Sequence, residues 1–189
     1  MGTVSPGGIV EQIASRLVYR NRWLSLREDR VRRPDGSDGL YSVVDKPDFA
    51  LVIPAEEDGF HLVEQYRYPV RGRYWEFPQG TATAGAARTP EELARAELAE
   101  ETGLRAGRMR LLGHLYCAYG MSSQGFDVFL ATELRPGPPA REASEQDMRQ
   151  ALVSRAEFER LVRSGRITDD STLAAYALLL MAERGAWAG

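Results

Sequence analysis

Residues 89–104 read Thr89-Pro-Glu-Glu-Leu-Ala-Arg-Ala-Glu-Leu-Ala-Glu-Glu-Thr-Gly-Leu104 and predict a helix with a defined start and end. Thr89 at the N-cap, Pro90 at the first helical position and Glu92 at the third form the pattern of a capping box. Gly103 supplies the left-handed residue that commonly ends a helix. A Gly- and Ala-rich stretch, residues 80–87, precedes this helix.

Three glutamates of this helix are spaced i, i+3, i+4: Glu97, Glu100 and Glu101. At about 100° per residue they lie on one side of the helix, in a sector shared with Leu93 and Leu104. Like charges beside apolar side chains are costly unless a cation neutralises them. All-oxygen ligands suit Mg²⁺ or Mn²⁺, so the spacing indicates a metal site. A solvated acidic face is the commoner explanation of such spacing taken alone, because Glu favours helices.

Flanking segments decide between these two interpretations. The helix follows Trp75-Glu-Phe-Pro-Gln-Gly80 and contains Glu97-Leu-Ala-Glu-Glu-Thr-Gly-Leu104, and together they resemble the Nudix box, G-x5-E-x7-R-E-U-x-E-E-x-G-U with U aliphatic. Three features depart from the box. Ala96 stands where the family has an arginine that orients a catalytic glutamate, two extra residues separate Gly80 from Glu97, and the first box glutamate falls on Ala86 or Arg88.

Segments outside the box resemble the ADP-ribose and nucleotide-sugar pyrophosphatase branch of this family. These are Glu64-Gln-Tyr-Arg-Tyr-Pro69 and Gly165-Arg-Ile-Thr-Asp-Asp-Ser-Thr-Leu173. The resemblance implies that Arg67 contacts substrate phosphate, for which guanidinium geometry is suited. It places Glu76 at the site and gives the carbonyl of Gln79 to the metal, with Glu97, Glu100 and Glu101.

Further residues are expected to contribute to catalysis or substrate binding. Trp75 is a candidate base-stacking residue, although a core position is the commoner role for such a side chain. The loop Tyr119-Gly-Met-Ser-Ser-Gln124 resembles the family's substrate-side loop, which makes Gln124 a candidate contact. The branch also carries a loop glutamate that helps to activate water, for which Glu145 is the first candidate and Asp147 the second. Glu100 and Glu101 complete the expected catalytic set.

The remainder of the chain predicts strands and two more helices. β-type runs lie at residues 16–19, 23–31, 40–44, 49–53, 60–66, 109–116 and 126–133, and helices are expected from Ser154 to Gly165 and from Ser171 to about Arg184. This order favours an α+β fold. The resemblance specifies a Nudix-type α/β/α sandwich with a mixed β-sheet and an N-terminal antiparallel strand element. Residues 1–8 are expected to be a flexible tail, residues 9–48 the N-terminal strand element, and residues 49–189 the Nudix hydrolase domain.

Composition limits the function further. The 189 residues carry a formal net charge of −3, which disfavours nucleic acid as a partner. Cys117 is the only cysteine, so neither an intramolecular disulfide nor a cysteine-based zinc site is available. The longest apolar run, residues 174–182, is too short to cross a bilayer, and the N-terminus lacks an apolar signal core. We therefore expect a cytoplasmic protein.

The leading hypothesis is hydrolysis of a pyrophosphate bond in ADP-ribose or a nucleotide sugar, with Mg²⁺ or Mn²⁺ as cofactor. Dinucleoside polyphosphates or RNA 5′ ends are alternative substrates, because Phe77-Pro-Gln-Gly80 also resembles RNA pyrophosphohydrolases. A nucleotide sensor of low or no activity is a third hypothesis, based on Ala96 and the missing first glutamate. Members of this branch commonly form homodimers through their N-terminal strands, so the resemblance implies a homodimer.

Overall fold

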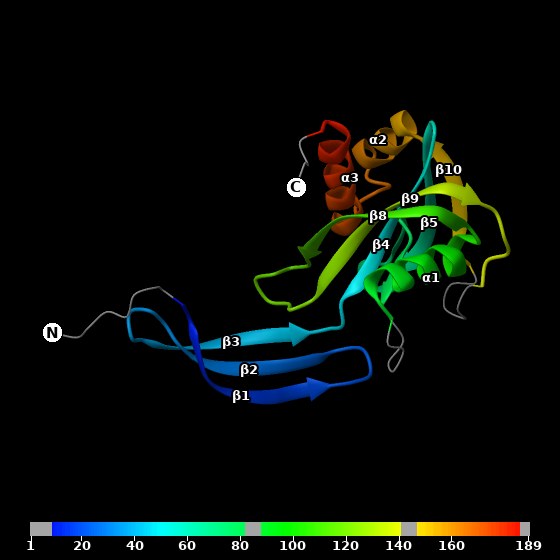
Figure 1. Cartoon of the computed structure of the whole chain (residues 1–189). Helices are drawn as coiled ribbons and strands as arrows, with labels where there is room; N and C mark the ends of the chain where they lie inside the picture. Colours follow the sequence, from blue (N-terminus) through cyan, green and yellow to red (C-terminus); the bar gives the residue numbers. More distant parts are fainter. Residues whose placement is uncertain (1–8, 82–87, 141–146, 186–189) are drawn as a thin grey trace. The chain divides into compact units, whose positions relative to one another are not determined.

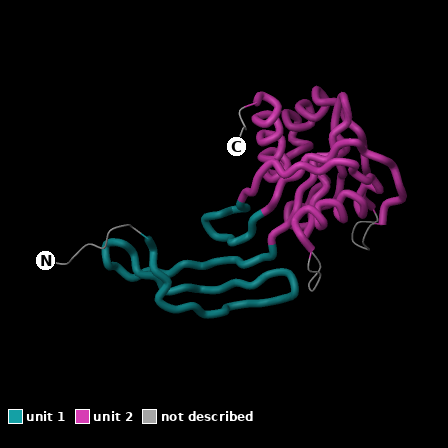
Figure 2. Tube along the Cα trace, in the orientation of Figure 1, with its two compact units in different colours: residues 1–47, 116–125 teal, residues 48–115, 126–189 magenta. Residues whose placement is uncertain are grey.

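The computed structural model describes residues 9–81, 88–140 and 147–185. The chain divides into two compact units, the first comprising residues 1–47 and 116–125 and the second residues 48–115 and 126–189 (Figure 2). The first unit therefore includes a segment, 116–125, that lies far from it in the sequence. In the part of the chain that is described, no helix has the length and apolarity needed to cross a membrane.

The first unit is built on a three-stranded antiparallel sheet in the order β1-β2-β3 (Figure 1). Its strands are β1 (Glu11–Arg20), β2 (Ser25–Arg32) and β3 (Asp38–Asp45). The turn between β2 and β3 forms around Gly36, which has a φ of 83° that glycine adopts without strain. Segment 116–125 joins β3 through backbone hydrogen bonds, from Val44 N to Met121 O (2.8 Å) and from Ser123 N to Val44 O (3.1 Å).

The second unit contains a mixed sheet in the order β10-β5-β4-β9-β8, in which β6 pairs with β5 and β7 pairs with β4. Its strands are β4 (Phe49–Glu56), β5 (Gly59–Arg67), β6 (Gly72–Glu76), β7 (Gln79–Thr81), β8 (Arg105–Tyr116), β9 (Gly125–Arg135) and β10 (Arg149–Ser154). β4 and β9 are parallel, whereas β5 is antiparallel to β4, β6 and β10. A short 3-10 helix, Tyr68–Val70, connects β5 to β6.

Helices cover both faces of this sheet and confirm the α/β/α sandwich (Figure 1). They are α1 (Pro90–Thr102), α2 (Arg155–Arg163) and α3 (Asp170–Glu183). On one face, Leu93 and Leu98 of α1 pack in a buried cluster with Ala50 and Val52 of β4. On the other, an aromatic cluster joins the sheet to α2 and α3, formed by Phe60, Phe77, Phe158 and Tyr176.

The predicted ends of α1 are confirmed. The Thr89 hydroxyl accepts from Glu92 N, and the Glu92 carboxylate accepts from Thr89 N, which completes the capping box. Gly103 ends the helix with a φ of 77°, in the left-handed region. These local signals fix where α1 starts and stops, and its apolar face fixes how it lies on the sheet. Together they determine which carboxylates face β7.

Candidate functional site

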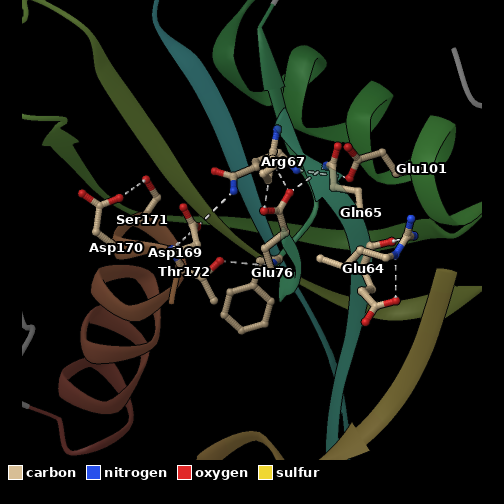
Figure 3. Close-up of polar contacts among 12 residues, drawn as sticks. Glu64, Gln65, Arg67, Glu76, Glu101, Asp169, Asp170, Ser171 and Thr172 are labelled. Carbon is tan, nitrogen blue, oxygen red and sulfur yellow. Dashed lines mark hydrogen bonds and ion pairs between the residues drawn. The ribbon is translucent and has the colours of Figure 1, made fainter. Parts of the chain in front are cut away.

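The centre of the candidate site is an ion pair on β5 and β6 between a buried glutamate and a half-exposed arginine. Residues opposite each other in an antiparallel pair share a face of the sheet. The β5–β6 register pairs Val63 with Glu76 and Gln65 with Tyr74, so Gln65, Arg67 and Glu76 lie on one face. The Glu76 side chain is 2% exposed and accepts from Arg67 Nε (3.1 Å), from Arg67 Nη2 and from Gln65 Nε2 (2.7 Å) (Figure 3). The predicted substrate-site residues Arg67 and Glu76 are therefore direct partners.

Burial and charge act in opposite directions on this pair. Burial raises the pKa of the Glu76 carboxyl above its ordinary value, and the Arg67 guanidinium opposes the rise. Burial acts to lower the pKa of Arg67, but the Glu76 carboxylate outweighs it and, with Asp169 and Glu101, raises that pKa. Arg67 thus remains cationic, and it lies within electrostatic reach of carboxylates on two different helices.

Glu101 and Glu97 bring α1 into contact with β7. Glu101 is 1% exposed and accepts a hydrogen bond from the backbone N–H of Gln79 at 3.3 Å (Figure 3). The Glu97 carboxylate lies against Gly80, where an added Cβ would meet its Oε2 at 2.4 Å. Only a glycine at position 80 permits this approach. Two of the predicted metal ligands, one helical turn apart, therefore flank the Gln79–Gly80 segment.

Glu100 is oriented differently. Its carboxylate lies 4.0 Å from Arg88 Nη1, and its side chain is 36% exposed. Within residues 9–81, 88–140 and 147–185, no three His, Cys, Asp or Glu side chains are grouped closely enough to hold a metal ion. In this structure Glu100 therefore lies apart from Glu97 and Glu101, next to Arg88, and its role as a metal ligand stays a prediction.

No arginine of α1 takes the place of the one that the Nudix box has at the position of Ala96. Arg95, beside Ala96, hydrogen-bonds to Glu91 (2.9 Å) and to the carbonyl of Ala106 (2.9 Å). These contacts direct it away from the carboxylates at Gln79 and Gly80. Arg67, from β5, is instead the cation that interacts electrostatically with Glu101.

The donor chemistry of the site fits a hard divalent cation. Three acidic residues surround the Arg67 guanidinium and interact with it electrostatically, namely Glu76, Glu101 and Asp169. Fully ionised, they outnumber the single guanidinium charge by two, with Glu97 close by at Gly80. Such an excess of buried negative charge favours binding of a cation, and carboxylate and carbonyl oxygens suit Mg²⁺ or Mn²⁺.

Trp75 and Asp147 are not brought to this cluster. Trp75 is opposite Glu64 in the β5–β6 register, so it lies on the other face of the strands from Arg67 and Glu76. Asp147 forms an ion pair with Arg73, whose guanidinium also binds Glu64 (3.3 Å). Glu64 is buried and accepts further from Arg166 Nη2 at 2.7 Å. The alternation of side chains along a strand separates these predicted residues from the site.

Two predicted residues remain, Gln124 and Glu145. Gln124 belongs to the first unit, where it is 6% exposed and its Nε2 donates to the carbonyl of Pro47 at 2.7 Å. Glu145 falls outside the described residues.

Sequence reasoning missed Asp169 and Thr172 in the first turn of α3. The Thr172 hydroxyl accepts from the backbone N–H of Phe77 at 3.0 Å, and Asp169 Oδ2 accepts from Gln79 Nε2 at 3.0 Å (Figure 3). The resemblance of residues 165–173 marked this segment without giving its residues a role. Asp169 also fits the pattern of an ordinary N-cap. The local sequence therefore gave no sign that its carboxylate has a second hydrogen-bond partner in Gln79.

Substitution of Gly80 by alanine tests the approach of Glu97. We expect the variant to fold with little loss of stability, because the atoms that must move are the end of a flexible side chain. The displaced carboxylate should weaken Mn²⁺ binding, by about tenfold if Glu97 is a ligand. Calorimetric titration with Mn²⁺ measures this, and thermal unfolding is the control. Unchanged Mn²⁺ affinity in a folded variant would remove Glu97 from the metal site.

Comparison with known proteins agrees with this fold. The model of the nucleoside diphosphate sugar hydrolase N-terminal domain matches residues 10–44, and that of the NUDIX domain matches residues 45–175. An ADP-ribose pyrophosphatase of Mycobacterium tuberculosis (strain ATCC 25618 / H37Rv) is 33% identical over 166 residues, covering 87% of this chain and 80% of its own. One of Bacillus subtilis (strain 168) is 29% identical over 168 residues, covering 88% and 89%.

Two further matches extend the comparison. A methanol dehydrogenase activator of Bacillus methanolicus is 26% identical over 173 residues, covering 90% of this chain and 92% of its own. The crystal structure of an ADP compounds hydrolase superposes with a TM-score of 0.82 at 19% identity, covering 93% of this chain and 95% of its own. This last match bears on the fold alone.

The match of the NUDIX domain to residues 45–175, which form most of this α/β/α sandwich, identifies the chain as a Nudix hydrolase. The chain belongs to the Nudix family, and within it to the ADP-ribose pyrophosphatase-like branch. The predicted family, branch and fold class are confirmed.

Proposed function

We propose that this protein hydrolyses the pyrophosphate bond of ADP-ribose or a closely related nucleotide sugar in a reaction that depends on Mg²⁺ or Mn²⁺. The observation that carries the proposal is the pair of carboxylates at Gln79–Gly80, buried Glu101 and half-buried Glu97, together with the partly exposed cation of Arg67. Arg67 contacts Glu76 through Nε and Nη2, yet its side chain remains 40% exposed. The 33% and 29% identical relatives named ADP-ribose pyrophosphatase support the choice of substrate.

Each residue of the cluster has a proposed role. Glu97 and Glu101 hold the metal, with Glu100 after it turns from Arg88 and with the carbonyl of Gln79. The bound metal supplies positive charge that neutralises phosphate oxygens as the reaction proceeds. Arg67 binds a substrate phosphate through its guanidinium, and Glu76 fixes the orientation of Arg67 through two hydrogen bonds.

The proposed reaction is a single displacement at phosphorus. The oxygen of a water molecule forms a bond to one phosphorus, the bridging P–O bond breaks, and a carboxylate takes the proton of the water. Glu100, Glu101 and the loop acid Glu145 are the candidates for this base, while the ion pair with Arg73 disfavours Asp147. With ADP-ribose the products are AMP and ribose 5-phosphate.

A substrate panel tests this function. ADP-ribose, UDP-glucose, GDP-mannose, a dinucleoside polyphosphate and 5′-triphosphorylated RNA are assayed with Mg²⁺, with Mn²⁺ and with a chelator. We expect ADP-ribose to give the highest kcat/KM, to yield AMP and ribose 5-phosphate, and to require the metal. A preference for the polyphosphate or RNA would replace the proposed substrate class. Tight nucleotide binding without turnover would support the nucleotide-sensor alternative instead.

The first unit supports a proposed homodimer. Every residue of β1 is exposed, including Ile13, Leu17, Val18 and Tyr19, which are 43–54% exposed. Apolar side chains in such number on one strand are typical of a surface that another chain covers. We expect sedimentation equilibrium to give twice the chain mass of 21.1 kDa. Replacement of Leu17 and Tyr19 by serine should shift the protein towards monomer, whereas a monomeric parent protein would refute the proposal.

A further inference from the structure

β7 links the two helical layers through one residue, Gln79. The β4–β7 register pairs Gln79 with Leu51 and Gly80 with Ala50, and Ala50 belongs to the core cluster under α1. Gly80 therefore faces α1, and the Gln79 side chain faces the opposite layer, which holds α3. The backbone N–H of Gln79 nevertheless donates to Glu101 of α1 at 3.3 Å. The same residue thus contacts α1 through its backbone and α3 through its side chain.

Asp169 makes both contacts on the α3 side with one oxygen atom. Its Oδ2 accepts from Thr172 N at 2.8 Å, which caps α3, and from Gln79 Nε2 at 3.0 Å (Figure 3). The second contact spans 90 residues of sequence. This hydrogen bond connects β7 to the first turn of α3. The cap fixes the position of the Asp169 carboxylate, which in turn accepts from the Gln79 side-chain amide.

An aspartate is an electrostatically costly choice for this cap. Asp169 adds negative charge beside Glu76 and acts to raise the pKa of that buried carboxyl. A neutral serine caps helices about as well as aspartate, and Ser154 does so at α2 by accepting from Glu157 N at 3.2 Å. Capping alone therefore does not require a carboxylate here. The hydrogen bond to Gln79 does require a carboxylate, because a serine side chain is too short to make both hydrogen bonds.

The geometry points to Asp169 as a positioning residue of the hydrolytic site: through the Gln79 side chain it holds the Gln79 backbone against Glu101. It does not touch substrate or metal in this role. This inference rests on the proposed function, in which Gln79 and Glu101 contribute ligands to the metal. Loss of the hydrogen bond between Asp169 and Gln79 lets β7 shift relative to α1. Gln79 and Glu101 then no longer keep a fixed separation.

Two substitutions separate positioning from capping. Asp169→Ser keeps the cap and removes the hydrogen bond to Gln79. Asp169→Asn keeps an oxygen at the Oδ2 position, and with it both hydrogen bonds, and removes the charge. The matched control is Asp170→Ser, which removes the neighbouring acid of the same helix turn, whose Oδ1 accepts from Ser171 Oγ at 3.4 Å.

Three quantities are measured on the full-length protein: Mn²⁺ affinity without substrate by electron paramagnetic resonance, kcat and KM for ADP-ribose, and the melting temperature. We expect Asp169→Ser to lower kcat and Mn²⁺ affinity by about 10-fold to 100-fold, as other outer-shell changes do. Because the cap is kept, Tm should change by less than about 2 °C. Asp169→Asn should restore both quantities to within about threefold, and Asp170→Ser should match the parent protein.

A double-mutant cycle with Gln79→Ala locates the effect. If Asp169 acts through the Gln79 side chain, adding Asp169→Ser to Gln79→Ala should cause no further loss of Mn²⁺ affinity or kcat. Additive losses would overturn this route. Unchanged Mn²⁺ affinity and kcat in Asp169→Ser would leave Asp169 a helix cap and refute the inference alone. A parent protein that neither binds Mn²⁺ nor hydrolyses ADP-ribose would refute the proposed function as well.

Discussion

Replacement of Glu101 by glutamine is expected to lower kcat for pyrophosphate hydrolysis by about three powers of ten, while the protein remains folded. Metal ions supply several kcal/mol of charge stabilisation in reactions of this type, and about 1.4 kcal/mol corresponds to a factor of ten in rate. Glu101 is almost completely buried next to Gln79 N, so a neutral side chain there removes charge where a cation would bind. Mn²⁺ affinity should fall together with kcat.

Stability should respond little to the same change. Glutamine has the shape of glutamate, and its carbonyl oxygen can still accept the hydrogen bond from Gln79 N. The substitution also removes one of the negative charges crowded around Arg67. Glu91→Gln is the matched control, because Glu91 lies on the same helix, is half-exposed and pairs with Arg95. Equal activity of the Glu101→Gln variant and the parent would show that this carboxylate has no part in hydrolysis.

Replacement of Arg67 by leucine is expected to destabilise the fold by about 2 kcal/mol at pH 7, less than for a fully buried pair because Arg67 is 40% exposed, and to abolish substrate binding. Removing one partner of a buried ion pair leaves the other charge uncompensated, which is strongly destabilising. Here that charge is on Glu76, whose side chain is 2% exposed. Urea denaturation gives the free energy of unfolding, and nucleotide titration gives the affinity.

The pH dependence of this loss follows from the Glu76 carboxyl. Burial raises its pKa, and without the opposing guanidinium the rise is larger. The folded state then prefers the protonated form of Glu76. Below the ordinary pKa of this carboxyl in the unfolded chain, the raised pKa costs the variant no stability. The variant loses stability as pH rises through the pKa of Glu76 in the folded state. The gap between parent and variant should therefore widen from about pH 4 to pH 7.

A second substitution checks the cause. Glu76→Gln in the Arg67→Leu background removes the uncompensated charge and should recover more than half of the lost stability at pH 7, without restoring activity. Arg67→Lys keeps a positive charge but loses the bidentate geometry, so it should be more stable than Arg67→Leu and still bind substrate weakly. A loss of stability that is independent of pH would contradict an ionised Glu76 as its source.

Local signals in the sequence predicted the elements that depend on local interactions. The caps Thr89 and Gly103 defined α1, and Ser154 defined the start of α2. The strands β6, β7 and β10 were not predicted. They have 3 to 6 residues, and β7 and β10 are defined by pairing with strands distant in sequence, whereas β6 pairs with the preceding strand β5.

The composition of the site shows the same division. Motif resemblance named Arg67, Glu76, Gln79, Glu97, Glu100 and Glu101, and the structure joins Arg67 to Glu76 and Gln79 to Glu101. Motif resemblance did not reveal that Trp75 lies on the opposite face of the strand or that Asp147 pairs with Arg73. Asp169 was missed because its partner Gln79 is 90 residues away.

The sequence by itself determined the helix that carries Glu97, Glu100 and Glu101, because caps and helical spacing are properties of adjacent residues. Only the tertiary structure decided which of these carboxylates face the Gln79–Gly80 strand and which one turns to Arg88. The physical reason is that ion pairing and burial depend on charges and surfaces supplied by strands and helices elsewhere in the chain. Glu76, Glu101 and Asp169 interact with Arg67 only after the fold brings them together from β6, α1 and the start of α3.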